Sequence, residues 1–168
     1  MKFEITHRWG GITLDEYEAL FFDEDFASAL AEHLRLGREV LRLDRAEDRI
    51  VRHVRCEPDQ DPDSPEGRAL AKRKAGFVEE LDYDRRARRG EWRTIPNLIP
   101  DRVKTNGTIE LRAEAGGVVR TVRGVCDVKL FGLGRLVEKQ AVKAIEKSYD
   151  DAAAFTAEWI ARARAHRR

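Results

Sequence analysis

The chain has 168 residues, of which 38% are charged and 42% are hydrophobic, a composition typical of a folded domain with a charged surface. Its 32 basic and 31 acidic residues give a net charge of +1, so the chain has no general attraction to nucleic acid, which is not an expected partner. No run of about 18 apolar residues is present that would span a membrane, and residues 1–11 lack the apolar core of a signal peptide. These features predict one cytoplasmic domain over residues 1–168.

Residues 1–36 predict a strand and two short helices. Apolar and polar side chains alternate in residues 2–9, which is typical of a half-buried strand, and His7 and Trp9 share its apolar face. The stretch TLDEYEALFF then begins with a capping-box motif, and DEDFASALAEHLRL begins with an acid that can cap a second helix.

Hydrophobic side chains then recur with a period of two, which predicts about six further antiparallel strands. Residues 38–58 are typical of a hairpin that turns near 46–48, and residues 76–96 of a second hairpin. Residues 105–132 predict a third hairpin that turns at two consecutive glycines. The acidic, proline-rich residues 57–68 predict a solvated loop.

A long C-terminal helix is predicted from about residue 134 to residue 164, or roughly 45 Å at about 1.5 Å per residue. Its apolar positions recur at steps of three and four, and small residues occupy the middle of this stripe: Ala141, Ala144 and Ser148. Small side chains either leave room for a cavity or let the helix approach the sheet closely. The sequence leaves both alternatives open.

The stretch DVKLFGLGRLVEKQ joins the last predicted strand to this helix, and its two glycines suggest a phosphate-binding turn. A dinucleotide-binding fingerprint requires a third glycine where this chain has Val137, and it requires a parallel strand after the helix. Both are missing. We therefore interpret Gly132 and Gly134 as a tight corner, with Glu138 in the first helical turn favouring the helix dipole.

Four stretches carry a resemblance to a known superfamily: KFEITHRW, DEDFASALAEHL, GFVEELDYD, and VCDVKLFGLGRLVEKQAVKAIEKSYDDAAAFTAEWI. Together with the order of elements, they resemble the START-like superfamily, also called SRPBCC or Bet v 1-like, close to its uncharacterised bacterial branch and more distantly to PRELI-type lipid-transfer proteins. The resemblance implies an α+β helix-grip fold. Such a fold has a curved antiparallel sheet of about six to seven strands, two short helices after the first strand, and a long C-terminal helix packed across the sheet.

The resemblance also implies a deep pocket between the sheet and the long helix for an apolar ligand such as a lipid, sterol or polyketide. Relatives include binders, transfer proteins, and cyclases or hydratases, so the fold does not choose the activity. The expected ligand-binding residues are His7, Trp9, Glu79, Leu81, Tyr83, Ile109, Leu111, Arg120, Val122, Ala141, Ala144, Ile145, Ser148 and Tyr149.

Two of these residues carry charge into the predicted pocket. An inward carboxylate at Glu79 needs a partner. Arg120 is either that partner or an anchor for a ligand carboxylate or phosphate. If the strand register is shifted by one residue, both side chains lie on a solvated face instead.

Motifs for metal binding and catalysis are missing from the sequence. The four histidines lie far apart, without an HxH, HExxH or Cys/His cluster, so no metal site is expected. Neither a Ser/His/Asp nor a Cys/His triad can be assembled, and we expect no catalytic residue and no cofactor. Cys56 and Cys126 are expected to be buried free thiols.

Basic tracts at residues 72–74, 85–89 and 162–168 offer a separate hypothesis. Gathered on one side, they would make transient contact with an anionic membrane surface. Interspersed acids favour solvated turns and a helix tail instead.

The sequence therefore predicts a START-like domain that binds a hydrophobic or amphiphilic small molecule such as a lipid. Transport of that molecule is an extension of this hypothesis. One alternative is a polyketide cyclase- or hydratase-type enzyme on the same fold, with His7 or Glu79 as acid or base. Another is a non-catalytic interaction module that uses the basic tracts. Oligomeric state is left open.

Overall fold

All strands in the described residues, 1–58 and 75–166 of a computed structural model, belong to one seven-stranded sheet. The strands are β1 (Lys2–Gly10), β2 (Leu36–Arg45), β3 (Arg49–Pro58), β4 (Phe77–Asp84), β5 (Arg89–Pro96), β6 (Val103–Glu114) and β7 (Gly117–Val128). Their order in the sheet is β1-β7-β6-β5-β4-β3-β2, with every neighbouring pair antiparallel. The helices of the described part are α1 (Leu14–Phe21), α2 (Glu24–His33) and α4 (Gly134–Ala165).

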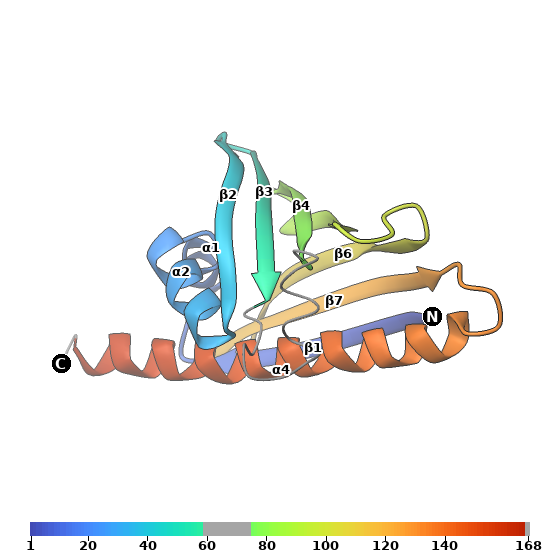
Figure 1. Ribbon diagram of the computed structural model, residues 1–168. Coiled ribbons are helices and arrows are strands. Elements are labelled where there is room, and N and C mark those ends of the chain that lie inside the picture. Colours follow the sequence, from blue (N-terminus) through green and yellow to red (C-terminus); the bar gives the residue numbers. More distant parts are fainter. Residues whose placement is uncertain (59–74, 167–168) are drawn as a thin grey trace.

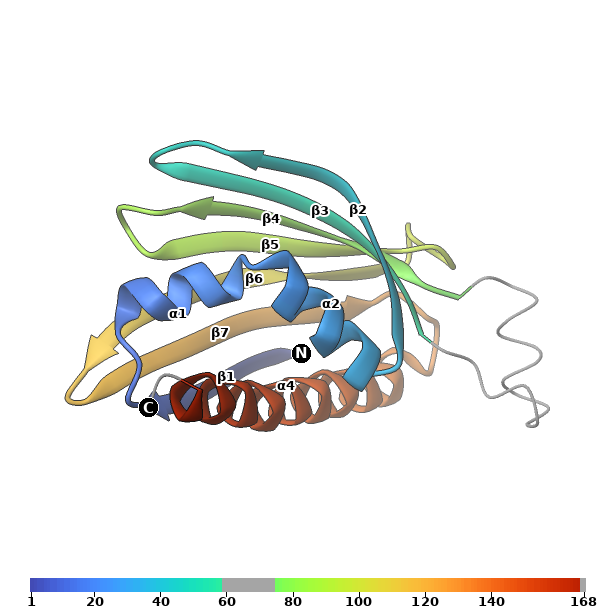
Figure 2. The same cartoon turned by 90° about the vertical axis from the view of Figure 1, so that its left-hand side faces the viewer.

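The sheet curves around the two short helices, as Figures 1 and 2 show. The long helix α4 runs along the end of the sheet that β1 and β7 form, and it also contacts α2. The order of elements and the curved antiparallel sheet confirm the predicted α+β architecture.

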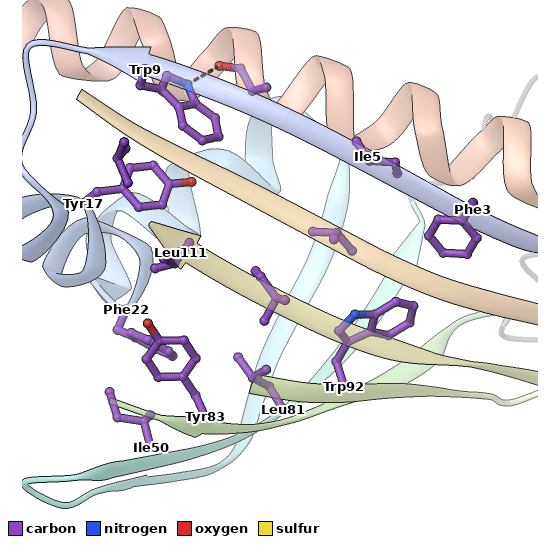
Figure 3. Close-up of a cluster of buried hydrophobic side chains, with 14 of the residues drawn as sticks. Phe3, Ile5, Trp9, Tyr17, Phe22, Ile50, Leu81, Tyr83, Trp92 and Leu111 are labelled. Atoms are coloured by element: carbon purple, nitrogen blue, oxygen red, sulfur yellow. Dashed lines mark hydrogen bonds between the residues drawn. The ribbon is translucent and has the colours of Figure 1, made fainter. Parts of the chain in front are cut away.

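The alternation in β1 places one row of large apolar side chains inward. Phe3, Ile5 and Trp9 each expose 8% or less of their surface. In Figure 3 they lie on the same side of the sheet as Tyr17 of α1 and Trp92 of β5. The Trp9 and Tyr17 rings stack with their centroids 4.8 Å apart, so α1 is packed onto β1 through aromatic contact.

Both short helices begin at the predicted residues. Thr13 Oγ1 accepts a hydrogen bond from the Glu16 backbone N–H, while the Glu16 carboxylate accepts one from the Thr13 N–H, which completes the capping box. At α2 the Asp23 carboxylate accepts from the Phe26 N–H at 2.7 Å. These caps fix the residues at which the two helices begin.

The corner between β7 and α4 confirms the structural interpretation of its two glycines. Gly132 has a φ of +74°, which disfavours any side chain. A Cβ atom on Gly134 would lie 2.6 Å from the Val128 carbonyl oxygen. The prediction that Glu138 lies in the first turn of α4 is wrong, since it lies in the second turn. There its carboxylate accepts a hydrogen bond from the Val128 N–H at 3.1 Å. This bond lowers the pKa of Glu138.

The inward face of α4 differs in part from the predicted stripe. Ala144 and Ser148 are exposed, so the prediction that they line a pocket is wrong. Each precedes an inward residue by one position, which is a rotation of about 100° around the helix axis. Ala141 is partly buried against the core. The inward residues at steps of three and four are Val142, Ile145, Tyr149, Ala153, Thr156 and Ile160.

The predicted hairpins are confirmed as β2–β3, β4–β5 and β6–β7. Cys56 and Cys126 are both free thiols; Cys126 is buried and Cys56 is partly exposed. Most of the predicted acidic loop at 57–68 and the basic tract at 72–74 lie outside the described residues.

Candidate functional site

A cavity of about 150 Å³ lies between the short helices and the strands at the β2–β3 end of the sheet. The helices contribute mainly apolar side chains, among them Phe26 and Leu30 of α2. The strands contribute polar side chains as well as Val54. The polar lining residues are Tyr17, Arg38, Arg52, Cys56, Glu79, Arg120 and Thr156.

This cavity lies to one side of the predicted pocket. The prediction placed the pocket between the sheet and the long helix, whereas α4 contributes only Thr156 to the lining of this cavity. Of the predicted ligand-binding residues, Glu79 and Arg120 reach it. The predicted residues Trp9, Leu81, Tyr83, Ile109, Leu111 and Val122 are buried in the hydrophobic core, and their contact with a ligand remains a prediction.

Arg120 is the most enclosed charged group in the cavity wall, with 5% of its surface exposed. Its guanidinium lies 4.9 Å from the centroid of the Trp9 ring and 5.3 Å from that of Tyr149, so two aromatic rings hold the cation. Nη1 donates a hydrogen bond to the Tyr17 hydroxyl at 3.3 Å. Nε has no partner in the described part of the chain.

His7 connects Arg120 to the surface. Nη2 of Arg120 lies 3.3 Å from His7 Nδ1, and His7 Nε2 lies 2.8 Å from Asp150 Oδ1. A guanidinium only donates, so Nδ1 accepts and the ring proton lies on Nε2, which donates to Asp150. The predicted acid or base His7 therefore has both ring nitrogens engaged.

The partner of Glu79 is Arg52, not Arg120. Arg52 Nη2 lies 3.5 Å from Glu79 Oε1, and both residues line the cavity. The two residues are diagonal neighbours across the β3–β4 pair, since Arg52 is opposite Leu81. The prediction missed Arg52, although it alternates inward with Ile50 and Val54 along β3. Like Arg120, it keeps an unpartnered Nε among the described residues.

The phenol and thiol groups of this region stay neutral. Burial raises the pKa of the Tyr17 and Tyr149 hydroxyls, and it raises the pKa of the Cys56 thiol to about 11. The charges of the cavity wall therefore come from its arginines and Glu79. Arg38 is neutralised by Glu24, which lies 2.7 Å away.

A buried carboxylate, which the sequence analysis also missed, lies outside the cavity. Glu18 of α1 is 3% exposed and accepts from the Tyr83 hydroxyl and from Arg85 Nε, each at 3.0 Å. Arg88 Nη1 pairs with it at 2.5 Å. Two arginines of the basic tract at 85–89 are thus paired with a buried carboxylate.

Neither a metal site nor a membrane-spanning helix has support among residues 1–58 and 75–166. These residues contain no group of His, Cys, Asp and Glu side chains arranged to hold a metal ion. They also contain no helix that is long and apolar enough to cross a membrane.

A curved antiparallel sheet, two short helices and a long C-terminal helix beside a polar-lined cavity define a helix-grip protein. The chain belongs to the family described as "protein of unknown function (DUF2505)", whose model matches residues 6–160. None of the curated proteins matches the sequence.

Solved structures with the same fold include protein TTHA0849 from Thermus thermophilus, with a TM-score of 0.66, 14% identity, and coverage of 97% of this chain and 99% of that one. The di-domain ARO/CYC protein StfQ from the steffimycin biosynthetic pathway has a TM-score of 0.59 at 15% identity, over 98% of this chain and 51% of its own. Norcoclaurine synthase from Thalictrum flavum has a TM-score of 0.57 at 14% identity, over 91% and 84%. At these identities the likeness shows the fold alone.

Proposed function

We propose that this chain is a single START-like domain, residues 1–168, that binds a hydrophobic or amphiphilic small molecule in the cytoplasm. The observation that carries the proposal is the cavity of about 150 Å³, which combines apolar helix side chains with buried polar groups. Small-molecule sites usually have this composition, mostly apolar with a few polar groups that orient the ligand.

The volume of the cavity limits the size of the ligand that it can hold. An engineered apolar cavity of about 150 Å³ in another protein binds benzene. The cavity here therefore holds a group of about the size of one aromatic ring or a short alkyl chain. A lipid is compatible with this site only if its chain extends beyond the cavity.

An enzyme of the cyclase or hydratase type is the second candidate. It is favoured by Glu79, a carboxylate in the cavity wall, and by the likeness in fold to the ARO/CYC protein StfQ. The Glu79 carboxylate is paired with Arg52 at 3.5 Å. Loss of turnover in Glu79→Gln with retained ligand binding would favour the enzyme over the binder.

The interaction module is a weaker proposal for the tract at 85–89. Arg85 and Arg88 pair with Glu18, and Arg86 lies 3.7 Å from Asp48. This pairing reduces the charge that the tract offers to an anionic membrane surface.

Native mass spectrometry of the purified full chain tests the binding function. We expect a retained small molecule in the wild type and its loss in Ala31→Leu, because Ala31 lines the cavity and a larger side chain fills it. Ala144→Leu is the control, since residue 144 is exposed on α4. If the wild type retains no small molecule and no apolar compound raises its melting temperature, the proposal is wrong.

A further inference from the structure

Arg120 brings a positive charge into the cavity wall that no described carboxylate neutralises. The other two lining arginines are paired, Arg38 with Glu24 and Arg52 with Glu79. Arg120 forms no ion pair with any carboxylate among residues 1–58 and 75–166, and Asp150 reaches it only through the imidazole of His7. One net positive charge therefore remains at the cavity.

The protein cannot remove this charge by deprotonation, because an arginine guanidinium stays protonated in proteins. The rings of Trp9 and Tyr149 stabilise the cation, but they carry no negative charge to compensate it. Among residues 1–58 and 75–166, the buried Nε–H of Arg120 has no acceptor, and neither has the Nε–H of Arg52. Buried polar groups normally have hydrogen-bond partners, so both side chains point to a missing acceptor.

The cavity is small, and every side chain that α2 contributes to its lining is apolar. Phe26 and Leu30 of α2 and Val54 of β3 line the same space of about 150 Å³ as Arg120. A ligand that fits it combines one anionic group with a body of about one aromatic ring or a short alkyl chain. The Tyr17 hydroxyl beside Arg120 stays protonated, because burial raises its pKa, and it does not supply the anion itself.

We propose that the cavity binds a small organic carboxylate whose carboxylate group pairs with Arg120 and whose aromatic or short alkyl body packs against α2. This inference rests on the proposed binding function and names its class of ligand. A carboxylate supplies the single negative charge and the acceptor that the wall lacks, and its pairing with a guanidinium is one of the stronger hydrogen-bonded contacts in proteins.

Calorimetric titration of the full chain with two matched probe pairs tests the inference. Phenylacetate is compared with 2-phenylethanol, and hexanoate with 1-hexanol, so each pair differs in the charged group and little else. We expect each carboxylate to bind wild type roughly tenfold or more tightly than its alcohol. Arg120→Met is expected to lose this preference, and Arg120→Lys to keep part of it.

Arg123→Met is the control, because Arg123 lies on the same strand as Arg120 but outside the cavity lining, where it pairs with Glu4 at 2.7 Å. It is expected to keep the preference for the carboxylate. Equal affinity of wild type for acid and alcohol would overturn the inference and leave the binding function standing. An equal loss of preference in Arg123→Met and in Arg120→Met would also overturn it, since the preference would then not depend on a charge in the cavity wall.

Two further outcomes are decisive. If none of the four probes binds wild type, the cavity takes no small apolar molecule of this size, and the inference and the binding function both fail at this site. If Arg120→Met does not fold, the wild-type comparison of acid with alcohol still decides, together with Arg120→Lys. An equal response in wild type overturns the inference in that case as well.

Discussion

Buried ionisable side chains around the cavity fall into two kinds. Tyr17, Tyr149 and Cys56 remain neutral because burial raises their pKa values. Arg52 and Arg120 have no neutral form to adopt, so they keep their charge and depend on their contacts. Arg52 has a carboxylate, whereas Arg120 has two rings, a hydroxyl and an imidazole. Ligand chemistry at this site therefore depends most on Arg120.

Cys56 offers a direct measurement at the residue scale. Its pKa is raised to about 11, mainly by burial, so little thiolate exists at pH 8. The rate of alkylation by iodoacetamide in Cys126→Ala is expected to rise about tenfold per pH unit from pH 7 to pH 10. A rate that levels off near pH 8.5, as for an ordinary thiol, would contradict the raised pKa. Cys56→Ala, which keeps only the buried Cys126, gives the background rate.

At the scale of elements, the attachment of α4 to β1 positions the cavity wall. Trp9 Nε1 donates a hydrogen bond to the Ala153 carbonyl at 3.1 Å, and Figure 3 shows this bond from strand to helix. His7 meets Asp150 one helical turn earlier. The same two strand residues contact Arg120, so the strand that anchors α4 also holds the buried guanidinium.

Trp9→Phe is expected to destabilise the fold by about 1 kcal/mol more than Trp92→Phe, because only the first substitution removes a hydrogen bond. The two indoles are matched in burial, with 5% and 8% exposed. Trp92 Nε1 has no partner among the described residues, so its loss removes an unsatisfied donor. Urea unfolding monitored by circular dichroism gives both values. Equal costs would mean that the Trp9 bond adds nothing beyond packing.

For the whole molecule, contacts between α1 and the β4–β5 hairpin connect segments that are far apart in the sequence. Glu18 of α1 receives hydrogen bonds from Tyr83 in β4 and from Arg85 in the β4–β5 turn. These partners are 65 and 67 residues away in sequence. The carboxylate therefore ties α1 to β4 and to the β4–β5 turn.

Glu18→Ala is expected to cost about 3 kcal/mol, because it leaves a buried hydroxyl and two arginines without their shared carboxylate. Asp15→Asn is the control, since Asp15 pairs with the same Arg88 but its side chain is 81% exposed. We expect it to cost less than about 1 kcal/mol. Chemical unfolding of the two variants measures the difference, and comparable losses would show that Glu18 acts as an ordinary surface charge.

The inward position of several site residues was predictable from the alternation of side chains along the strands. The alternation in β1 and β7 placed His7, Trp9 and Arg120 inward, and the pairing of His7 opposite Arg120 in the sheet follows from that register. Arg52 was equally accessible to the same reasoning, because it alternates with Ile50 and Val54. On α4 the small size of Ala144 and Ser148 suggested a pocket wall, but helix rotation exposes both.

By itself, the sequence determined the helix starts, the hairpins and the inward row of most strands, because caps, turns and periodicity act over a few residues. Only the tertiary structure decided which ionisable groups meet and where the cavity lies. Glu79 lies beside Arg52 and not Arg120 because the β3–β4 register sets that diagonal. Arg120 reaches Tyr17, 103 residues away, because the curved sheet folds over α1. Such contacts depend on strand order and curvature, which no local pattern encodes.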